Sequence, residues 1–167
     1  MRPETRPSAR ASPDPVRWAR GIALSTALIA HTTQAAVVLD CGNWVGPDAL
    51  VEPWEETSGT FARGAVRVAL LDFGEPECCP QHLAVLIPAN MYGGRACFVL
   101  AQSSLVPNGW VKVGIDGVEA TRDAEPGLLL SVPVFGIDPL TGAADPDDRR
   151  VITLRVRQAA GTVELEK

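Results

Sequence analysis

Residues 66–102 read VRVALLDFGEPECCPQHLAVLIPANMYGGRACFVLAQ, and this stretch decides the expected fold. It contains three apolar runs, at 66–73, 83–87 and 95–102, separated by turns rich in glycine and proline. The β-branched residues in the runs and the flanking glycines favour strands over helices. The second and third runs are expected to pair as a hairpin around residues 90–94. The stretch therefore predicts the centre of a β-sheet.

The chain on either side continues the same pattern. Further strands are expected at 37–41, 110–116, 128–137, 151–157 and 162–165, and residues 138–148 are expected to form a loop. Residues 117–125 are the one place that suits a short helical turn. Pro133 has no N–H to donate, so its strand is expected at an edge or on a bulge. About seven to nine short strands with almost no helix predict an all-β fold, an antiparallel β-sandwich or an open barrel.

Residues 1–35 carry the features of a secretory signal peptide. Five arginines precede a short apolar run at 21–30, and small residues follow at Thr33 and Ala35. A run of this length is too short to span a bilayer, which needs roughly 20 residues. We therefore expect export, with a single β domain at residues 36–167 and no transmembrane span after cleavage. The alternative is an unprocessed, disordered tail.

Charge and motifs narrow the range of partners. Residues 36–167 hold 18 acidic and ten basic residues, a net charge of −8. A domain of this charge does not attract nucleic acid or anionic lipid. The sequence contains no phosphate loop and no dinucleotide fingerprint, so no cofactor is expected. The remaining partners are a protein of the cell envelope or a small ligand, and the sequence does not say which.

Four cysteines in an exported domain suggest up to two disulfides. In the expected hairpin Cys97 lies opposite Pro88, and Cys79 lies nine residues back along that strand. Nine residues of strand span roughly 30 Å, whereas a disulfide needs Cα atoms within about 7 Å. The favoured pair is therefore Cys41–Cys97. Cys78 and Cys79 are left to form a vicinal disulfide or to stay free.

Residues 78–82 (CCPQH) offer one alternative chemistry. An imidazolium at His82 would favour the thiolate of Cys78 or Cys79, and thiolates with an imidazole suit soft metals. This pattern supports a thiol-redox or soft-metal protein as the second hypothesis. No metal site is favoured, because no second cysteine or histidine cluster accompanies the segment.

Residues 44–56 offer two further hypotheses. Glu55 and Glu56 form a carboxylate pair beside an aromatic residue, which would suit a weak hydrolase. Trp44 and Trp54 lie in the same irregular segment and would provide either an apolar binding surface or a cover for one end of the sandwich. No catalytic residue is favoured, because no base, nucleophile and acid can be assembled from the sequence.

Residues 49–56 (ALVEPWEE) and 60–72 (TFARGAVRVALLD) resemble small exported proteins of unknown function from alphaproteobacteria. The resemblance implies export and carries no known activity. The leading hypothesis is an exported, periplasmic or secreted, disulfide-stabilised β protein of the cell envelope. It would act by binding or as an accessory protein, and not as an enzyme.

Overall fold

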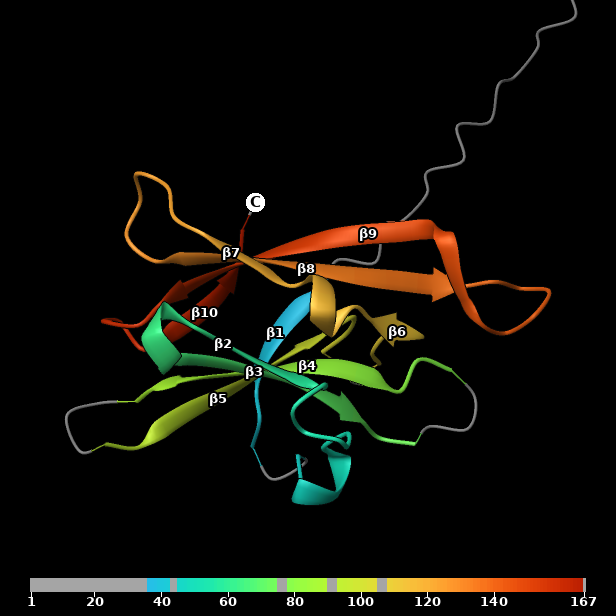
Figure 1. The fold of residues 1–167 in the computed structure, drawn as a ribbon, viewed down its shortest axis with the longest axis horizontal. Helices are drawn as coiled ribbons and strands as arrows, with labels where there is room; N and C mark the ends of the chain where they lie inside the picture. The colour runs from blue at the N-terminus through green and yellow to red at the C-terminus, as the bar shows by residue number, and fades with distance from the viewer. Residues whose placement is uncertain (1–35, 43–44, 75–77, 90–92, 105–107, 167) are drawn as a thin grey trace, which may run out of the picture. The chain divides into compact units, whose positions relative to one another are not determined.

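The computed structural model describes residues 36–42, 45–74, 78–89, 93–104 and 108–166, and the statements below concern these residues. The signal-peptide prediction for residues 1–35 and the candidate Trp44 lie outside them. The described residues form two antiparallel sheets that face each other (Figure 1). The predicted all-β class is confirmed, with ten strands where seven to nine were expected. No helix in this part of the chain is long and apolar enough to cross a bilayer.

The first sheet has the strand order β1-β5-β4-β3-β2. Its strands are β1 (Val37–Asp40), β2 (Ser58–Phe61), β3 (Val66–Asp72), β4 (Gln81–Pro88) and β5 (Arg95–Ala101). The expected hairpin is present, since β4 and β5 pair from Leu83–Leu100 to Pro88–Arg95, but its register places Cys97 opposite Leu86 and not opposite Pro88. The stretch that predicted a sheet therefore supplies the three central strands of this one.

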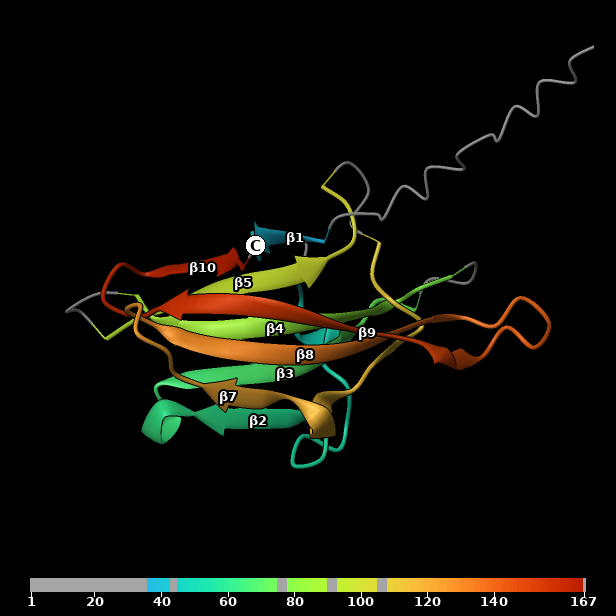
Figure 2. The same ribbon diagram turned by 90° about the horizontal axis from the view of Figure 1, so that it is seen from above.

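The second sheet has the order β10-β9-β8-β6, and β7 also pairs with β8. Its strands are β6 (Lys112–Val113), β7 (Glu119–Thr121), β8 (Leu128–Ile137), β9 (Ala144–Arg157) and β10 (Thr162–Leu165). The β8–β9 hairpin is long and extends past the strands of the first sheet (Figure 2). The edge strands β1 and β10 lie next to each other, which draws the two sheets together along that side.

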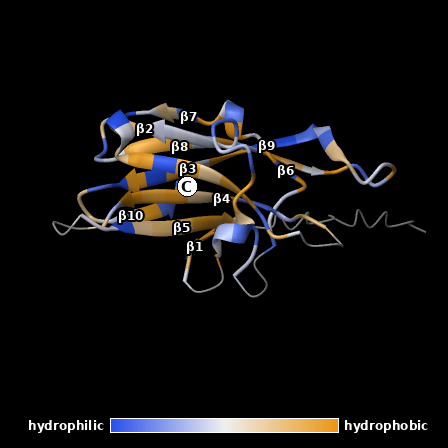
Figure 3. Ribbon diagram, turned by 60° about the horizontal axis from the view of Figure 1, so that its bottom comes forward, coloured by the Kyte–Doolittle hydropathy of each residue, from blue (hydrophilic) through white to orange (hydrophobic). Residues whose placement is uncertain are grey.

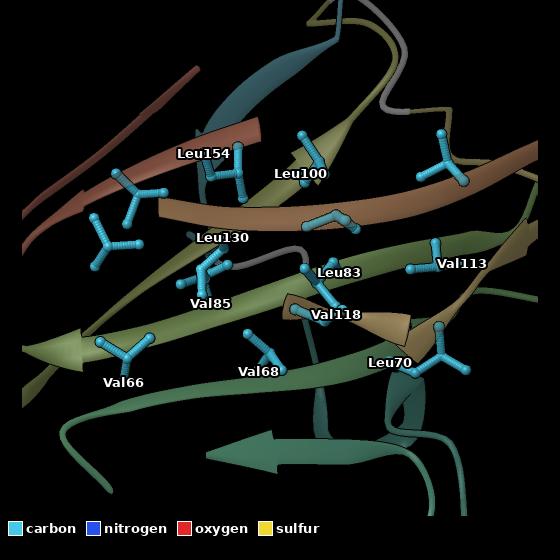
Figure 4. Packing of buried hydrophobic residues seen from close by; sticks show 14 of the residues in the cluster. Val66, Val68, Leu70, Leu83, Val85, Leu100, Val113, Val118, Leu130 and Leu154 are labelled. Carbon is cyan, nitrogen blue, oxygen red and sulfur yellow. The ribbon is translucent and has the colours of Figure 1, made fainter. Parts of the chain in front are cut away.

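Apolar side chains fill the space between the sheets. Alternate residues of the central strands point inward, which is the period of two that a strand imposes. Val66 and Val68 of β3 and Leu83 and Val85 of β4 face Leu130 and Leu154 of the second sheet (Figure 4). Each of these side chains is at most 1% exposed. This core joins the two sheets into one domain.

A second, smaller apolar cluster covers the outer face of the first sheet. It contains Cys41, Ala49, Ala69, Leu71, Ala84 and Val99. Cys41 is bonded to Cys97 of β5 with a Cα–Cα distance of 5.4 Å, so the predicted Cys41–Cys97 disulfide is confirmed. The bond ties the end of β1 to the central hairpin. It thereby holds the segment that follows β1 over the outer face.

Several local predictions are wrong. Residues 144–148, expected in a loop, belong to β9, and the strand expected at 110–116 is reduced to Lys112–Val113. Residues Glu119–Thr121 form β7 and not a helical turn, because Val118 and Ala120 alternate inward onto the core while Glu119 points outward. Pro133 lies in an interior strand, with β9 on one side of β8 and β6 and β7 on the other. The ladder irregularity of β8 lies at residues 135–137, beyond Pro133.

Pro133 is tolerated because the neighbouring strand is interrupted beside it. The Gly114 N–H donates to the Pro133 carbonyl at 2.8 Å, and in an antiparallel ladder the N and O of one residue point to the same neighbour. The missing N–H therefore faces the interval between β6 and β7, where Ile115–Gly117 form a short 3-10 helix. A Cβ on Gly117 would lie 3.1 Å from the Pro133 ring, so glycine gives the ring its room.

Candidate functional site

The segment of residues 78–82 lies where the chain enters β4. Cys78 and Cys79 are joined to each other, and no cysteine among the described residues is free. Cys78 is exposed and Cys79 is half-buried. The disulfide therefore presents one of its two residues to solvent.

Backbone hydrogen bonds hold this segment against its neighbours. The Gly109 N–H donates to the Cys79 carbonyl at 2.9 Å, and Gln81 exchanges two bonds with Trp110, at 3.1 and 2.8 Å. The chain passes so close at this point that a Cβ on Gly109 would lie 2.0 Å from the Gln81 carbonyl oxygen. The vicinal disulfide thus sits on an anchored backbone.

His82 is buried, with 1% of its surface exposed. Its Nδ1 lies 3.0 Å from the Pro80 carbonyl oxygen, and its ring meets Phe73 edge-on at 5.0 Å between centroids. The sulfurs of Cys78 and Cys79 are bonded to each other, so neither is a thiolate in this state. No group of three or more metal-ligating side chains occurs in the described part of the chain.

The candidates of the irregular segment lie at the surface. Trp54 is 42% exposed, and Glu55 and Glu56 are exposed beside it. The loop is closed by side-chain bonds to its own backbone, with Thr57 donating to the Pro53 carbonyl and Ser58 to the Trp54 carbonyl. Neither glutamate lines the two pockets described below. The geometry gives the hydrolase hypothesis no support.

A charged network on the outer face of the second sheet did not emerge from the sequence. Arg155 of β9 has a side chain that is only 3% exposed. Its guanidinium donates two bonds to Asp123, at 3.0 and 2.8 Å, and two to Glu166, at 2.7 and 2.8 Å. These paired bonds match the planar fork of arginine to the two oxygens of each carboxylate. The network ties the β7–β8 loop and the C-terminal strand to β9.

This network shifts the pKa values of its members. Hydrogen bonds from Arg155 lower the pKa of Asp123 to about 2. Hydrogen bonds from the same guanidinium lower the pKa of Glu166 below its usual range. The bonds to Asp123 and Glu166 raise the pKa of Arg155. All three groups are therefore charged at neutral pH.

Beside the network a pocket of about 280 Å³ opens at one end of the second sheet, between the β7–β8 loop and the β9–β10 turn. We call it the sheet-end pocket. Its lining consists of Arg122, Pro126, Gly127, Leu128, Val156, Arg157, Gln158, Ala159 and Ala160. Most of the lining is apolar, and its charged members are both arginines.

The polar side chains of the sheet-end pocket are two guanidinium groups and one amide. Gln158 Nε2 is buried and has no hydrogen-bond partner among the described residues. Arg157 forms ion pairs with Glu164 at 3.3 Å and with Glu125 at 3.9 Å. Arg122 makes no ion pair in the described part of the chain. An apolar floor with a few polar groups at its rim is the usual build of a small-molecule site.

A second, shallower recess of about 180 Å³ lies on the outer face of the same sheet. Lys112, Phe135 and Arg149 border it, and the Lys112 Nζ lies 5.5 Å from the centre of the Phe135 ring. Figure 3 shows the hydrophilic part of β9 in this half of the molecule, in contrast to the apolar strands of the core. The lining of this recess contains Asp116 as well as Lys112 and Arg149, so the recess carries charges of both signs.

The sequence held only a partial signal for these sites. The alternation of β9 places Arg155 and Arg157 on the outer face, as expected for charged residues in a strand. Nothing local indicates that Arg155 is buried, because its cover comes from the loop that holds Asp123.

The chain matches no protein-family model, no curated protein and no solved structure.

Proposed function

We propose that this chain is an exported binding protein without catalytic activity, which holds a small ligand in the sheet-end pocket. The observation that carries the proposal is the build of that pocket, with an apolar floor of Leu128 and Val156 and an unpartnered donor at Gln158. Its volume of about 280 Å³ lies just below the usual range for ligand pockets, which run from about 300 to 1,000 Å³. The ligand is therefore smaller than a typical drug.

A fragment screen tests the binding role. Backbone amide spectra of the disulfide-bonded protein would be recorded with a small library of neutral, anionic and cationic fragments. We expect saturable shifts at residues 122–128 and 156–160 with at least one fragment. If no fragment changes the chemical shifts of these amides, or if all binding maps to the loop around Trp54, the proposed role of the pocket is wrong.

Export is supported by the leader pattern of residues 1–35 and agrees with the disulfide between Cys41 and Cys97. The expected location is the periplasm or the medium. Expression in a Gram-negative host followed by fractionation and intact-mass analysis tests this. We expect a mature chain that begins at Ala36 outside the cytoplasm. A full-length chain retained in the cytoplasm would contradict it.

A second candidate function is thiol redox exchange at the vicinal disulfide. The observation that favours it is the exposure of Cys78, which leaves this disulfide open to an attacking thiolate. Two electrons and two protons from an external dithiol would convert the bond to two thiols, and the dithiol would leave as a disulfide. Alkylation after titration with dithiothreitol tests it: labels should appear at Cys78 and Cys79 before Cys41 and Cys97. Simultaneous labelling of all four would argue against a redox role.

A further inference from the structure

Resting on the proposed function, we infer that the sheet-end pocket takes a small carboxylic acid, with its carboxylate at Arg122 and Gln158 and a short apolar tail over Leu128 and Val156. The chemistry of the floor and that of the rim point to the two ends of one amphipathic molecule. Neither end was assigned by the sequence.

The floor of the pocket is apolar and is kept open by a glycine. Leu128 is 6% exposed and Val156 is fully buried, so these side chains belong to the core directly beneath the pocket, and Ala159 and Ala160 add exposed apolar surface. Gly127 has φ +130°, and a Cβ there would lie 3.0 Å from the Val156 carbonyl oxygen. Other residues rarely adopt this conformation, so no side chain at 127 fills the floor. A hydrocarbon tail of a few carbons would bury its surface here.

The rim offers hydrogen-bond donors and positive charge. Arg122, Arg157 and Gln158 are its polar members, and no carboxylate lines the pocket. The nearby acids are engaged elsewhere, since Asp123 pairs with Arg155 and Glu164 pairs with Arg157. Glu125 lies 3.7 Å from Arg155 and 3.9 Å from Arg157. One cation, Arg122, is left without an ion pair among the described residues, and one buried amide lacks an acceptor.

A carboxylate would pair with Arg122 and would also supply a hydrogen-bond acceptor for the Gln158 amide. It carries one negative charge for the exposed Arg122. Solvent does not reach Gln158 Nε2 in this structure, so the second oxygen accepts from it once the Gln158 side chain turns its amide toward the pocket. Guanidinium and carboxylate match in a planar geometry, and a charge-assisted hydrogen bond is stronger than a neutral one. A buried donor that gains an acceptor also no longer bears the cost of being unpaired. An ammonium group would instead face two arginines.

The test uses three probes with the same six-carbon tail, namely hexanoate, hexan-1-ol and hexylammonium. Binding to the disulfide-bonded protein would be followed by amide shifts at residues 122–128 and 156–160. We expect saturable binding of hexanoate, binding of hexan-1-ol that is weaker by roughly tenfold, and no binding of hexylammonium.

Two variants place the carboxylate. Arg122→Gln removes the unpaired charge, and Gln158→Glu keeps the side-chain shape but replaces the donor with an acceptor. Each should weaken hexanoate binding by roughly tenfold or more while leaving hexan-1-ol within about threefold. Arg149→Gln is the matched control, because it removes the same charge outside the pocket. Arg149 lies eight residues before the lining residue Arg157 along β9, roughly 26 Å at 3.3 Å per residue. Thermal melts and amide spectra of each variant confirm that the fold is kept.

The outcomes separate the ligand class from the binding role. If hexan-1-ol binds as tightly as hexanoate and Arg122→Gln changes neither, the carboxylic-acid class is wrong and the pocket still binds a small ligand. Tighter binding of hexylammonium would likewise overturn the class. If none of the three probes shifts these amide signals while other fragments do, the carboxylic-acid class is wrong and the binding role of the pocket still stands. If hexanoate binds equally to wild type, Arg122→Gln and Gln158→Glu, the placement at the rim is wrong.

Discussion

At the scale of single residues, Gly109 makes the closest approach of any described glycine to the backbone of another segment. Its N–H donates to the Cys79 carbonyl, and Gln81 and the His82 ring both lie close to the position that a Cβ would take. A Cβ at this position would lie 2.0 Å from the Gln81 carbonyl oxygen and 2.7 Å from the His82 ring. Backbone that is already hydrogen-bonded on both sides cannot shift to make room. Glycine is therefore required here by space.

Gly109→Ala should lower the free energy of unfolding by about 1–3 kcal/mol, the usual cost of inserting a methyl group into a closely packed site. Gly94→Ala is the control, because a Cβ there would meet only the Ala89 side chain at 3.8 Å. Its effect should stay within about 0.5 kcal/mol. Urea unfolding of both variants measures the difference. Equal stability of the two would show that residues 79–82 move aside freely.

The carboxylates around Arg155 make the stability of the folded domain depend on pH in the acidic range. Hydrogen bonds from Arg155 hold the pKa of Asp123 at about 2 and lower that of Glu166. Between the ordinary pKa of aspartate, 3.8, and about 2, the unfolded chain binds more protons than the folded one. The contribution of these groups is thus complete above the unfolded value and is lost as the pH falls through the folded value.

The midpoint of thermal unfolding should therefore fall as the pH is lowered from 5 to 2. Asp123→Asn should be less stable than wild type at pH 5 and should show a shallower dependence on pH. Asp147→Asn is a control in which an exposed aspartate of β9 outside this network is neutralised. Calorimetry at pH steps of about half a unit would measure the slopes. A wild-type slope that Asp123→Asn leaves unchanged would remove Asp123 from the acid response.

At the scale of elements, the disulfides differ in what they connect. Cys41–Cys97 joins residues 56 positions apart and links β1 to the central hairpin, whereas Cys78–Cys79 joins neighbours in the chain. A crosslink stabilises mainly by restricting the unfolded chain, and the restriction grows with the length of the closed loop. Only the first bond is therefore expected to contribute much to folding.

Replacing Cys41 and Cys97 together by serine should lower the free energy of unfolding by about 4 kcal/mol in the loop-entropy account. Replacing Cys78 and Cys79 together by serine should cost far less, because that bond closes almost no loop. Denaturant unfolding of the two double variants compares them directly. A larger loss from the vicinal pair would mean that this bond shapes the entry to β4.

β9 is longer than its partner β10, so its far half has an open edge. β10 pairs only with residues 154–157, so residues 144 and 149–152 pair with β8 alone among the described strands, and residues 145–148 bulge out of that ladder. Such an edge is a template for pairing with another chain. Here Asp145, Pro146, Asp147 and Asp148 lie along it, followed by Arg149 and Arg150. Charges and proline on an edge strand oppose this kind of association.

Replacing Asp145 and Asp147 by valine should therefore make the protein self-associate more strongly than the wild type does. Replacing both by asparagine removes the charge without adding β propensity, and separates the two effects. Sedimentation velocity at several concentrations would follow the change. A valine variant that sediments like the wild type at all concentrations would show that the edge is protected by something other than its charges.

At the scale of the whole domain, one apolar core carries the contact between the two sheets. Leu130 is fully buried at its centre, between β8 and the first sheet (Figure 4), whereas Leu140 at the tip of the β8–β9 hairpin is 94% exposed. The same residue type thus occupies the two extremes of the domain. This contrast makes the cost of losing core packing measurable within one chain.

Leu130→Ala should lower the free energy of unfolding by about 2–5 kcal/mol, because the cavity it leaves adds to the lost burial. Leu140→Ala should stay within about 0.5 kcal/mol. Thermal unfolding of the oxidised proteins provides the comparison. Equal losses would mean that the β8–β9 hairpin tip is covered in solution.

The sequence alone determined the class of fold, the central hairpin and the Cys41–Cys97 bond. Each rests on a local rule: alternation of side chains, turn residues, and the reach of an extended chain. These rules also placed Arg155 on the outward side of its strand. Where the local rule competed with tertiary packing it failed, as at Pro133, whose lost hydrogen bond is absorbed by a gap in the adjacent strand.

Only the tertiary structure decided which residues share a site. The predicted candidates Trp54, Glu55 and Glu56 lie exposed on a loop, and His82 is packed against Phe73. The sheet-end pocket instead joins the β7–β8 loop to the β9–β10 turn, which lie some thirty residues apart in the chain. A pocket between distant segments depends on how two loops fold over a sheet. No spacing within either segment encodes that arrangement, because the contacts that form it are long-range.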